Sequence, residues 1–506
     1  MFYPAGIAAT FWIPSVAQAS HLVVALTRLI RIAASSTRSP RHRQPAGRLD
    51  VTRMADMRPV TSMLIGSLAA WVLAGCAASG PVPAAAEPRG EARQCPEGVA
   101  AASRCVAGRD SAGAYYWLVV PPAWNGTLVV HSHGGPELGA PRAARAADDL
   151  KRWSVWSRAG YAYAGSGYRQ GGVAVTSAAE DSERVRRIFI AEFGAPKRTV
   201  LHGQSWGAGV AAKAAEKFGV PAAGGKGPYD AVLLTSGVLG GGSASYNFRL
   251  DLRVIYEAVC GNHPAPGEAA YPLWQGLPPG SALSRGQLSA RVDECTGAGR
   301  RGADRTPEQQ ARLDAITKVV RIPERSVASH LAWATWHFQD IVFERLGDRN
   351  PFGNVGVRYR GSSDDDALNA RVVRYAADPA AQAAFAADAD LSGRIAVPVL
   401  TVHAVDDPMA FVELESFFHD RMVQGGSGDR LVQTFTDDHE HSYLSDAQYV
   451  AAMAALLAWV EHGDKPTPER VAARCFSVPA AFDPAKGCRF LPAYVPAPLT
   501  ERVPAR

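Results

Sequence analysis

The most informative motif of this chain lies in Thr199-Val200-Leu201-His202-Gly203-Gln204-Ser205-Trp206-Gly207. It holds the pentapeptide G-x-S-x-G between an aliphatic run and an Ala-rich segment that ends before Gly219. A nucleophile elbow needs this context, because the serine sits in a strained turn between a strand and a helix where side chains of neighbours would collide. The alternative is an ordinary glycine-rich turn, because a chain with 48 glycines can contain G-x-S-x-G by chance. We expect Ser205 to be a nucleophile.

Strands and helices alternate on both sides of this stretch. The pattern predicts strands at residues 115–120, 127–133, 161–164, 198–202, 230–235, 395–403 and 430–435. It predicts helices at residues 143–159, 182–193, 206–218 and 447–462. Strands that alternate with helices form βαβ units, so the sequence predicts an α/β fold with a mostly parallel central sheet flanked by helices.

The alternation stops between residues 240 and 392. This segment of about 150 residues is too long for a loop in a compact domain, so we expect a mainly helical cap inserted before the strand at 395–403. The core is then residues 95–239 and 393–465, followed by a Pro-rich C-terminal extension at 466–506. The helical spacing of Trp333, Trp336 and His337 fits either packing inside the cap or an aromatic-lined pocket for an acyl or alcohol group.

A second segment with chemical content is His131-Ser132-His133-Gly134-Gly135-Pro136, which follows an early apolar strand. Acyl transfer develops an oxyanion, which needs fixed N–H donors in a site with little water. We expect the backbone N–H groups of Trp206 and Gly135 to supply them, with Gly134 in reserve, because Pro136 has no N–H. The alternative is a turn with no chemical role.

Acid and base candidates follow in the chain order that α/β-hydrolases use. Val405-Asp406-Asp407-Pro408 comes directly after the strand at 395–403, and Asp438-His439-Glu440-His441 precedes the last predicted helix. The order Ser, Asp, His suits a triad in which a neutral imidazole takes the serine proton and a carboxylate holds the imidazole in the right tautomer.

With these segments the chain resembles the α/β-hydrolases of the serine-hydrolase superfamily, over about residues 110–240 and 393–465. Many members carry a segment similar to H-G-x-x-D-P after the cap, and H-A-V-D-D-P at 403–408 resembles it. The resemblance implies that Asp407 is the acid, with Asp406 open because Ala404 stands where the family has Gly. Members also show G-H-x before the last helix, which implies His441 as the base, with His439 open because Glu440 replaces that Gly.

The resemblance implies a serine hydrolase that acts through an acyl-enzyme. Together with the cap aromatics and the N-terminal signal described below, it leads us to expect an exported enzyme that cleaves carboxylic esters of a small molecule with an aromatic or apolar part. A capped serine peptidase or amidase would use the same triad, because attack on esters and amides shares its first step. A non-catalytic surface protein on a hydrolase scaffold is the third possibility, since a fold does not imply activity. No Cys/His spacing suggests zinc, and no cofactor is expected.

The N-terminal region has the features of an export signal. Arg58 precedes a short apolar run at 63–73, so we expect a signal peptide at 57–75 and a flexible tether at 76–94. Leu73-Ala74-Gly75-Cys76 resembles the lipobox of bacterial lipoproteins, which implies a lipid anchor at Cys76. Cleavage without lipidation within 82–86 is the alternative. Residues 1–56 do not fit a signal, and we expect translation to start at Met54 or Met57.

Charge and cysteine content agree with an exported enzyme. The chain of 506 residues has a net charge of +5, but its first 75 residues hold eight Arg against two Asp, so the remainder is nearly neutral. Neither nucleic-acid binding nor a basic membrane-binding face is expected. Without Cys76, six cysteines remain, and they allow fifteen disulfide connectivities. Pairing between sequence neighbours would give Cys95–Cys105, Cys260–Cys295 and Cys475–Cys488, and free thiols are the alternative expected of a cytosolic chain.

Overall fold

The computed structural model describes residues 87–220, 225–482 and 487–506. The expected signal peptide at 57–75, the lipidation site at Cys76 and residues 1–56 lie outside the described residues. Within the described part of the chain, no helix combines the length and the apolar character needed to cross a bilayer.

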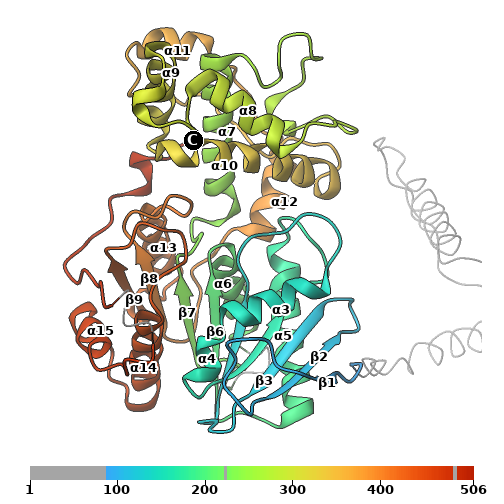
Figure 1. Ribbon diagram of the computed structural model, residues 1–506, viewed down its shortest axis with the longest axis vertical. Coiled ribbons are helices and arrows are strands. Elements are labelled where there is room, and N and C mark those ends of the chain that lie inside the picture. The colour runs from blue at the N-terminus through green and yellow to red at the C-terminus, as the bar shows by residue number, and fades with distance from the viewer. Residues whose placement is uncertain (1–86, 221–224, 483–486) are drawn as a thin grey trace, which may run out of the picture. The chain divides into compact units, whose positions relative to one another are not determined.

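A nine-stranded sheet forms the centre of the fold, in the order β1-β2-β3-β5-β4-β6-β7-β8-β9 (Figure 1). Its strands are β1 (Glu91–Arg93), β2 (Arg104–Arg109), β3 (Tyr115–Val120), β4 (Thr127–Ser132), β5 (Ala162–Ser166), β6 (Arg198–Gln204), β7 (Ala231–Thr235), β8 (Val399–Ala404) and β9 (Leu431–Thr436). The pairs from β5 through β4 to β9 are parallel, and β1, β2 and β3 add an antiparallel end. The sheet is therefore mostly parallel, as predicted.

Helices cover both faces of this sheet, and each face has its own hydrophobic cluster. Along β4, Leu128 and Val130 belong to one cluster and Val129 to the other, because successive side chains point to opposite faces. One face packs against α5 (Val175–Phe193), α6 (Trp206–Phe218) and α13 (Glu413–Gln424). The other packs against α3 (Ala143–Arg152), α4 (Val155–Arg158), α14 (Asp446–His462) and α15 (Pro468–Cys475). This confirms the predicted α/β-hydrolase fold.

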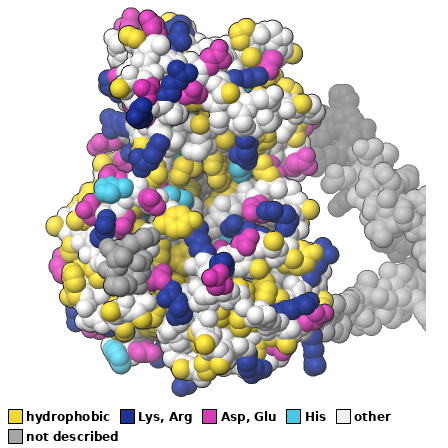
Figure 2. Space-filling model, viewed as in Figure 1, with side chains coloured by type: hydrophobic (Ala, Val, Ile, Leu, Met, Phe, Trp, Pro, Cys, Tyr) yellow, Lys and Arg dark blue, Asp and Glu magenta, His cyan; other side chains and the backbone are white. Residues whose placement is uncertain are grey.

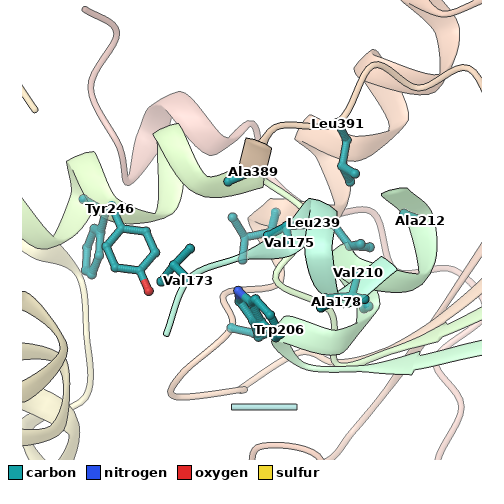
Figure 3. Packing of buried hydrophobic residues seen from close by; sticks show 14 of the residues in the cluster. Val173, Val175, Ala178, Trp206, Val210, Ala212, Leu239, Tyr246, Ala389 and Leu391 are labelled. Atoms are coloured by element: carbon teal, nitrogen blue, oxygen red, sulfur yellow. The ribbon is translucent and has the colours of Figure 1, made fainter. Parts of the chain in front are cut away.

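The segment between β7 and β8 is mainly helical. Its helices are α7 (Gly241–Cys260), α8 (Arg285–Thr296), α9 (Pro307–Val320), α10 (Val327–Ala332), α11 (Asp365–Arg371) and α12 (Pro379–Ala389). They are joined by the short 3₁₀ helices η1 (Leu273–Gln275), η2 (Gly302–Asp304) and η3 (Glu324–Ser326) and by the π-helical segments η4 (Trp333–His337) and η5 (Asp340–Arg345). The sequence predicted a mainly helical cap inserted before the strand at 395–403, and the position of the segment before β8 confirms that prediction. Figure 3 shows Tyr246 of α7 and Ala389 of α12 in the same apolar cluster as Val175 of α5 and Val210 of α6. The cap and the sheet thus share one core.

Several elements differ from the sequence-based expectation. The helix expected at 182–193 is longer, since α5 begins at Val175, where the carboxylate of Asp388 accepts the N–H groups of Val175 and Thr176. The helix expected at 143–159 is divided into α3 and α4, because the chain turns at Trp153 so that Trp153 and Trp156 can both pack against His202, with ring centroids 4.5 and 4.9 Å from it. The strand expected at 395–403 begins at Val399, directly after Pro398, which cannot donate to a neighbouring strand. Strands β1 and β2 were not expected, and β1 lies inside the proposed tether; all three of its residues are exposed and leave no hydrophobic pattern.

The C-terminal extension runs along the edge of the sheet and reaches the cap. Phe490 makes an isolated β-bridge to Thr436 at the end of β9, and the short 3₁₀ helix η7 (Leu499–Glu501) follows in the extension. Another short 3₁₀ helix, η6 (Gly428–Arg430), lies directly before β9. At the end of the sequence, Arg506 Nη2 donates to Asp251 Oδ1 of α7 at 2.6 Å. The extension therefore connects β9 with α7 by specific contacts.

Three disulfides join sequence neighbours: Cys95–Cys105, Cys260–Cys295 and Cys475–Cys488. Of the fifteen connectivities that the sequence allows, the structure has the local one. The first bond holds the segment after β1 to β2, the second ties the end of α7 to α8, and the third ties α15 to the C-terminal extension.

Candidate active site

Ser205 lies at the sharp turn between β6 and α6. Its backbone has φ 58° and ψ −126°, a conformation that L residues rarely adopt. The turn is held by two hydrogen bonds: the Ser205 N–H donates to the carbonyl of Thr235, and the Val238 N–H donates to the carbonyl of Ser205, each at 3.0 Å. A Cβ at Gly207 would collide with the carbonyl oxygens of Ser132 and His133, so only glycine lets α6 approach the end of β4. These are the features expected of a nucleophile elbow.

Two further loops bring an imidazole and a carboxylate to this serine. Ser205 Oγ lies 2.7 Å from His441 Nε2, in the loop after β9. His441 Nδ1 lies 2.9 and 2.8 Å from the two carboxylate oxygens of Asp407, in the loop after β8. Asp407 Oδ1 also accepts the backbone N–H groups of Met409 and Ala410 at 2.8 and 2.9 Å. With Nδ1–H donated to Asp407, Nε2 is left to accept the serine proton.

The alternative acid and base form a separate pair. His439 Nδ1 lies 2.7 Å from Asp406 Oδ2, and their side chains are 59 % and 64 % exposed. Neither residue lines the cavity at Ser205. The structure thus brings together Ser205, Asp407 and His441, and it leaves Asp406 and His439 on the surface.

A buried ion pair supports the acid loop from behind. His403 Nδ1 lies 3.0 Å from Glu415 Oε1, its Nε2 lies 2.8 Å from the carbonyl of Ala410, and Asp407 Oδ2 is 3.8 Å away. Burial alone would lower the pKa of His403, but the hydrogen bond and the charge of Glu415, together with Asp407, raise it above its usual value. The contact of His403 Nε2 with the carbonyl of Ala410 therefore helps to hold the loop that carries Asp407.

The loop after β4 lies against the nucleophile. A Cβ at Gly134 would lie 2.9 Å from the Cβ of Ser205, so this close approach requires glycine. Gly134, Gly135 and Trp206 all line the cavity at Ser205. In the described part of the chain, the N–H groups of Gly135 and Trp206 make no hydrogen bond, so both remain available to an oxyanion.

Charged residues beneath the loop fix its position. Arg145 Nη2 donates to the carbonyl of Gly134 at 2.6 Å. His131 Nε2 lies 3.0 Å from Asp149 Oδ2, and its Nδ1 lies 2.7 Å from Nδ1 of His202. Burial, with a further contribution from the charge of Arg145, lowers the pKa of His133 to about 4, so His133 is neutral at pH 7.

The cavity at Ser205 has a volume of about 320 Å³. Its lining consists of Gly134, Gly135, Arg145, Arg152, Gln204, Ser205, Trp206, Val238, Tyr246, Arg249, Trp333, Met409, His441 and Tyr443. Of the three cap residues that the sequence singled out, Trp333 lines this cavity; Trp336 borders another hollow, and His337 is buried with its Nε2 3.0 Å from the carbonyl of Pro136. Within the described residues, no group of three or more His, Cys, Asp or Glu is arranged to hold a metal ion.

Sequence reasoning missed the arginines of this cavity. Arg145, Arg152 and Arg249 lie on helices with no motif of their own, and their convergence depends on tertiary structure. The one local signal is the spacing of three between Tyr246 and Arg249 on α7, which places both on the same helix face.

Comparisons with known proteins give distant likenesses. No family model and no curated protein matches the sequence. Among solved structures, a puromycin-hydrolysing peptidase from Mycobacterium tuberculosis is 11 % identical over 71 % of this chain and 40 % of its own, with a TM-score of 0.34. An esterase from Pyrococcus furiosus is 12 % identical over 70 % of this chain and 88 % of its own (TM-score 0.34). Feruloyl esterase B from Aspergillus oryzae is 13 % identical over 72 % and 81 % (TM-score 0.36).

The chain spans about two fifths of the length of that peptidase and of a puromycin hydrolase, of which it covers 39 %. At these identities and scores, the likenesses assign neither an activity nor a substrate to this chain.

Proposed function

We propose that this protein is a serine hydrolase that cleaves carboxylic esters through an acyl-enzyme on Ser205. The observation that carries the proposal is the continuous chain of hydrogen bonds from Ser205 Oγ to His441 Nε2, at 2.7 Å, and from His441 Nδ1 to Asp407, at 2.8 Å. The strained elbow and the two unpaired N–H groups beside Ser205 support it, because together they supply a nucleophile, a base and an oxyanion site.

In the proposed mechanism, Ser205 Oγ attacks the ester carbonyl carbon while His441 Nε2 takes the hydroxyl proton. Asp407 orients His441 and stabilises the imidazolium, and the N–H groups of Trp206 and Gly135 hold the oxyanion. The tetrahedral intermediate collapses, the carbon–oxygen bond to the alcohol breaks, and His441 gives its proton to the departing alcohol. A water molecule, deprotonated by the same imidazole, then releases the acid and restores Ser205.

The test is hydrolysis of 4-nitrophenyl butyrate, compared with an aminoacyl 4-nitroanilide, by the protein and by its Ser205→Ala variant. We expect ester turnover that falls by about 10⁶-fold or to background in Ser205→Ala, because the triad acts as a unit. A fluorophosphonate probe should label Ser205 in the unaltered protein. Turnover of the anilide at a rate similar to that of the ester would favour a peptidase or amidase, and folded protein with neither labelling nor turnover would contradict the proposal.

We also infer that the protein is exported, with a lipid anchor at Cys76. The three disulfides support export, because such bonds persist in oxidising compartments. Mass spectrometry of the mature protein from native cells should find an N-terminus at a lipidated Cys76 and no peptide from residues 1–56. An unlipidated N-terminus within 82–86 would instead support ordinary cleavage.

A further inference from the structure

Arg249 is a buried cation without a counter-ion. It lies on α7, is 6 % exposed and lines the cavity at Ser205. Among the described residues its guanidinium makes one hydrogen bond, from Nη1 to the carbonyl of Ser245 at 2.7 Å, and no carboxylate lies within ion-pairing distance. Its Nε is buried without a partner. Burial lowers the pKa of Arg249, as expected for a cation that has lost its hydration and gained no anion.

Two aromatic rings hold this guanidinium. The Cζ of Arg249 lies 5.2 Å from the ring centroid of Tyr246 and 5.1 Å from that of Trp333, and both rings line the same cavity. The Tyr246 hydroxyl is also buried, and it has no hydrogen-bond partner among the described residues. Because Tyr246 and Arg249 are three residues apart on α7, they share a helix face, and their unpaired donors lie at the same side of the cavity.

The rest of the cavity is also positive, but its other arginines have hydrogen-bond partners or are exposed. Arg145 donates to the carbonyl of Gly134 and lies 3.6 Å from Glu137. Arg152 is exposed and donates to the carbonyl of Ser442 at 2.6 Å. No Asp or Glu is present among the described residues that line the cavity. Figure 2 shows Lys and Arg side chains on both sides of the hollow between the cap and the sheet.

An unpaired buried charge lowers the free energy of unfolding of the ligand-free protein by several kcal/mol. A ligand that brings a carboxylate removes this cost, because a guanidinium presents its N–H groups in a planar fork that matches a carboxylate. On the basis of the proposed esterase function, we propose that the substrate carries a carboxylate at one end of the ester. This carboxylate pairs with Arg249 and accepts a hydrogen bond from the Tyr246 hydroxyl. The substrate is thus an acidic ester rather than a neutral one.

The test uses two pairs of esters that differ in one charge. The first pair, 4-nitrophenyl hydrogen adipate and its methyl ester, places the carboxylate in the acyl group. The second, the butyrate esters of 4-hydroxybenzoate and of 4-hydroxybenzamide, places it in the leaving group. After division by the rate of uncatalysed hydrolysis, we expect kcat/KM to favour the carboxylate by about 10- to 100-fold in one of the pairs, the range for a charged hydrogen bond.

Variants at Arg249 assign that preference to its guanidinium. Arg249→Met should reduce the preference to near unity, and Arg249→Lys should retain part of it, because lysine supplies a point charge without the fork. Arg285→Met is the matched control: Arg285 is an exposed cap arginine, 4.7 Å from the ring of Trp336 and outside the cavity, so its removal should leave the preference unchanged.

Thermal unfolding separates binding from a structural role. Arg253 lies one turn further along α7 and donates four hydrogen bonds, to Ala334, Thr335, Tyr271 and Gly276. We expect Arg253→Met to lower the Tm, because these partners lose their donor. Arg249→Met should leave the Tm unchanged or raise it, because it removes an uncompensated charge. A lower Tm in Arg249→Met, similar to that in Arg253→Met, would assign Arg249 to stability and overturn the proposal.

These experiments distinguish a failure of the carboxylate site from a failure of the esterase proposal. If neutral esters are hydrolysed through Ser205 and neither pair shows a preference, the carboxylate site is wrong and the esterase proposal stands. A preference that survives in Arg249→Met also overturns the site. If no ester is hydrolysed, calorimetry on Ser205→Ala with hexanoate and hexanamide measures the site without turnover: tighter binding of hexanoate that is lost on adding Arg249→Met supports it, and equal or undetectable binding overturns it.

Discussion

At the scale of single residues, two adjacent aspartates should respond differently to the same substitution. Asp407→Asn would offer an amide N–H to His441 Nδ1 and favour the wrong tautomer, so we expect kcat to fall by about 10⁴-fold. Asp406→Asn should leave kcat within about twofold, because Asp406 pairs with the exposed His439 instead. The measurement is steady-state ester hydrolysis, with circular dichroism to verify folding. Equal losses in the two variants would contradict the assignment of the acid.

The same contrast explains how far the sequence could identify the site. The motifs restricted the acid to Asp406 or Asp407 and the base to His439 or His441, and they favoured the set that the structure brings to Ser205. Neighbouring loop residues differ in which way their side chains point, and no local pattern encodes this direction. Arg249 carried no signal, because its lack of a counter-ion follows from the packing of α7 against the cavity.

At the scale of elements, substitution of two glycines of α6 by alanine should have opposite effects on the free energy of unfolding. Gly207→Ala would drive a methyl group into the backbone at the end of β4, so we expect a free energy of unfolding lower by about 3 kcal/mol, or no folded protein. Gly209→Ala places its Cβ 3.4 Å from the carbonyl of Val238, an ordinary contact, and should stabilise the protein by up to about 1 kcal/mol through helix propensity. Urea unfolding of both variants checks this; a tolerated Gly207→Ala would contradict the close approach.

Elements were predictable where local pattern and tertiary packing agree. Strand β3 and helix α6 have the expected bounds, since their apolar runs are buried and flanked by turn residues or glycine. Helix α3 ends early because two tryptophans must both reach the sheet face, which is a tertiary requirement. Strand β1 has no apolar face and forms by pairing with β2 alone, so no pattern in its own residues could reveal it.

At the scale of the whole molecule, the cap and the sheet are joined by one apolar cluster, and the Ser205 cavity is lined from both. Gly134 and Trp206 come from the sheet side, whereas Tyr246, Arg249 and Trp333 come from the cap. Substrate specificity therefore depends on the same packing that stabilises the fold. Several buried histidines belong to this packing, and they make the stability of the fold depend on pH.

We predict that the protein loses stability as the pH falls from 7 to 5. Burial lowers the pKa of five histidines: to about 4 for His133, 2 for His263, 3 for His330 and 3 for His337, and well below its usual value for His202. Their unfolded pKa is about 6.5, so below that pH the unfolded chain binds protons that the folded chain does not, and each histidine lowers the free energy of unfolding by up to about 1.4 kcal/mol per pH unit.

His403 has the opposite sign: its raised pKa stabilises the fold fully below about pH 6.5, and this contribution is lost as the pH rises through the folded value. Among the histidines, five groups against one give a net loss in acid. Burial raises the pKa of five carboxyl groups, which therefore have the sign of His403 and offset part of this loss: Asp181, Glu216, Asp251, Glu257 and Asp390. Urea unfolding at pH 7, 6 and 5 measures the slope, which His330→Gln should reduce by about one proton. The exposed His419→Gln is the control and should leave the slope unchanged. A free energy of unfolding that stays constant over this range would show that the buried histidines do not remain neutral in the folded protein.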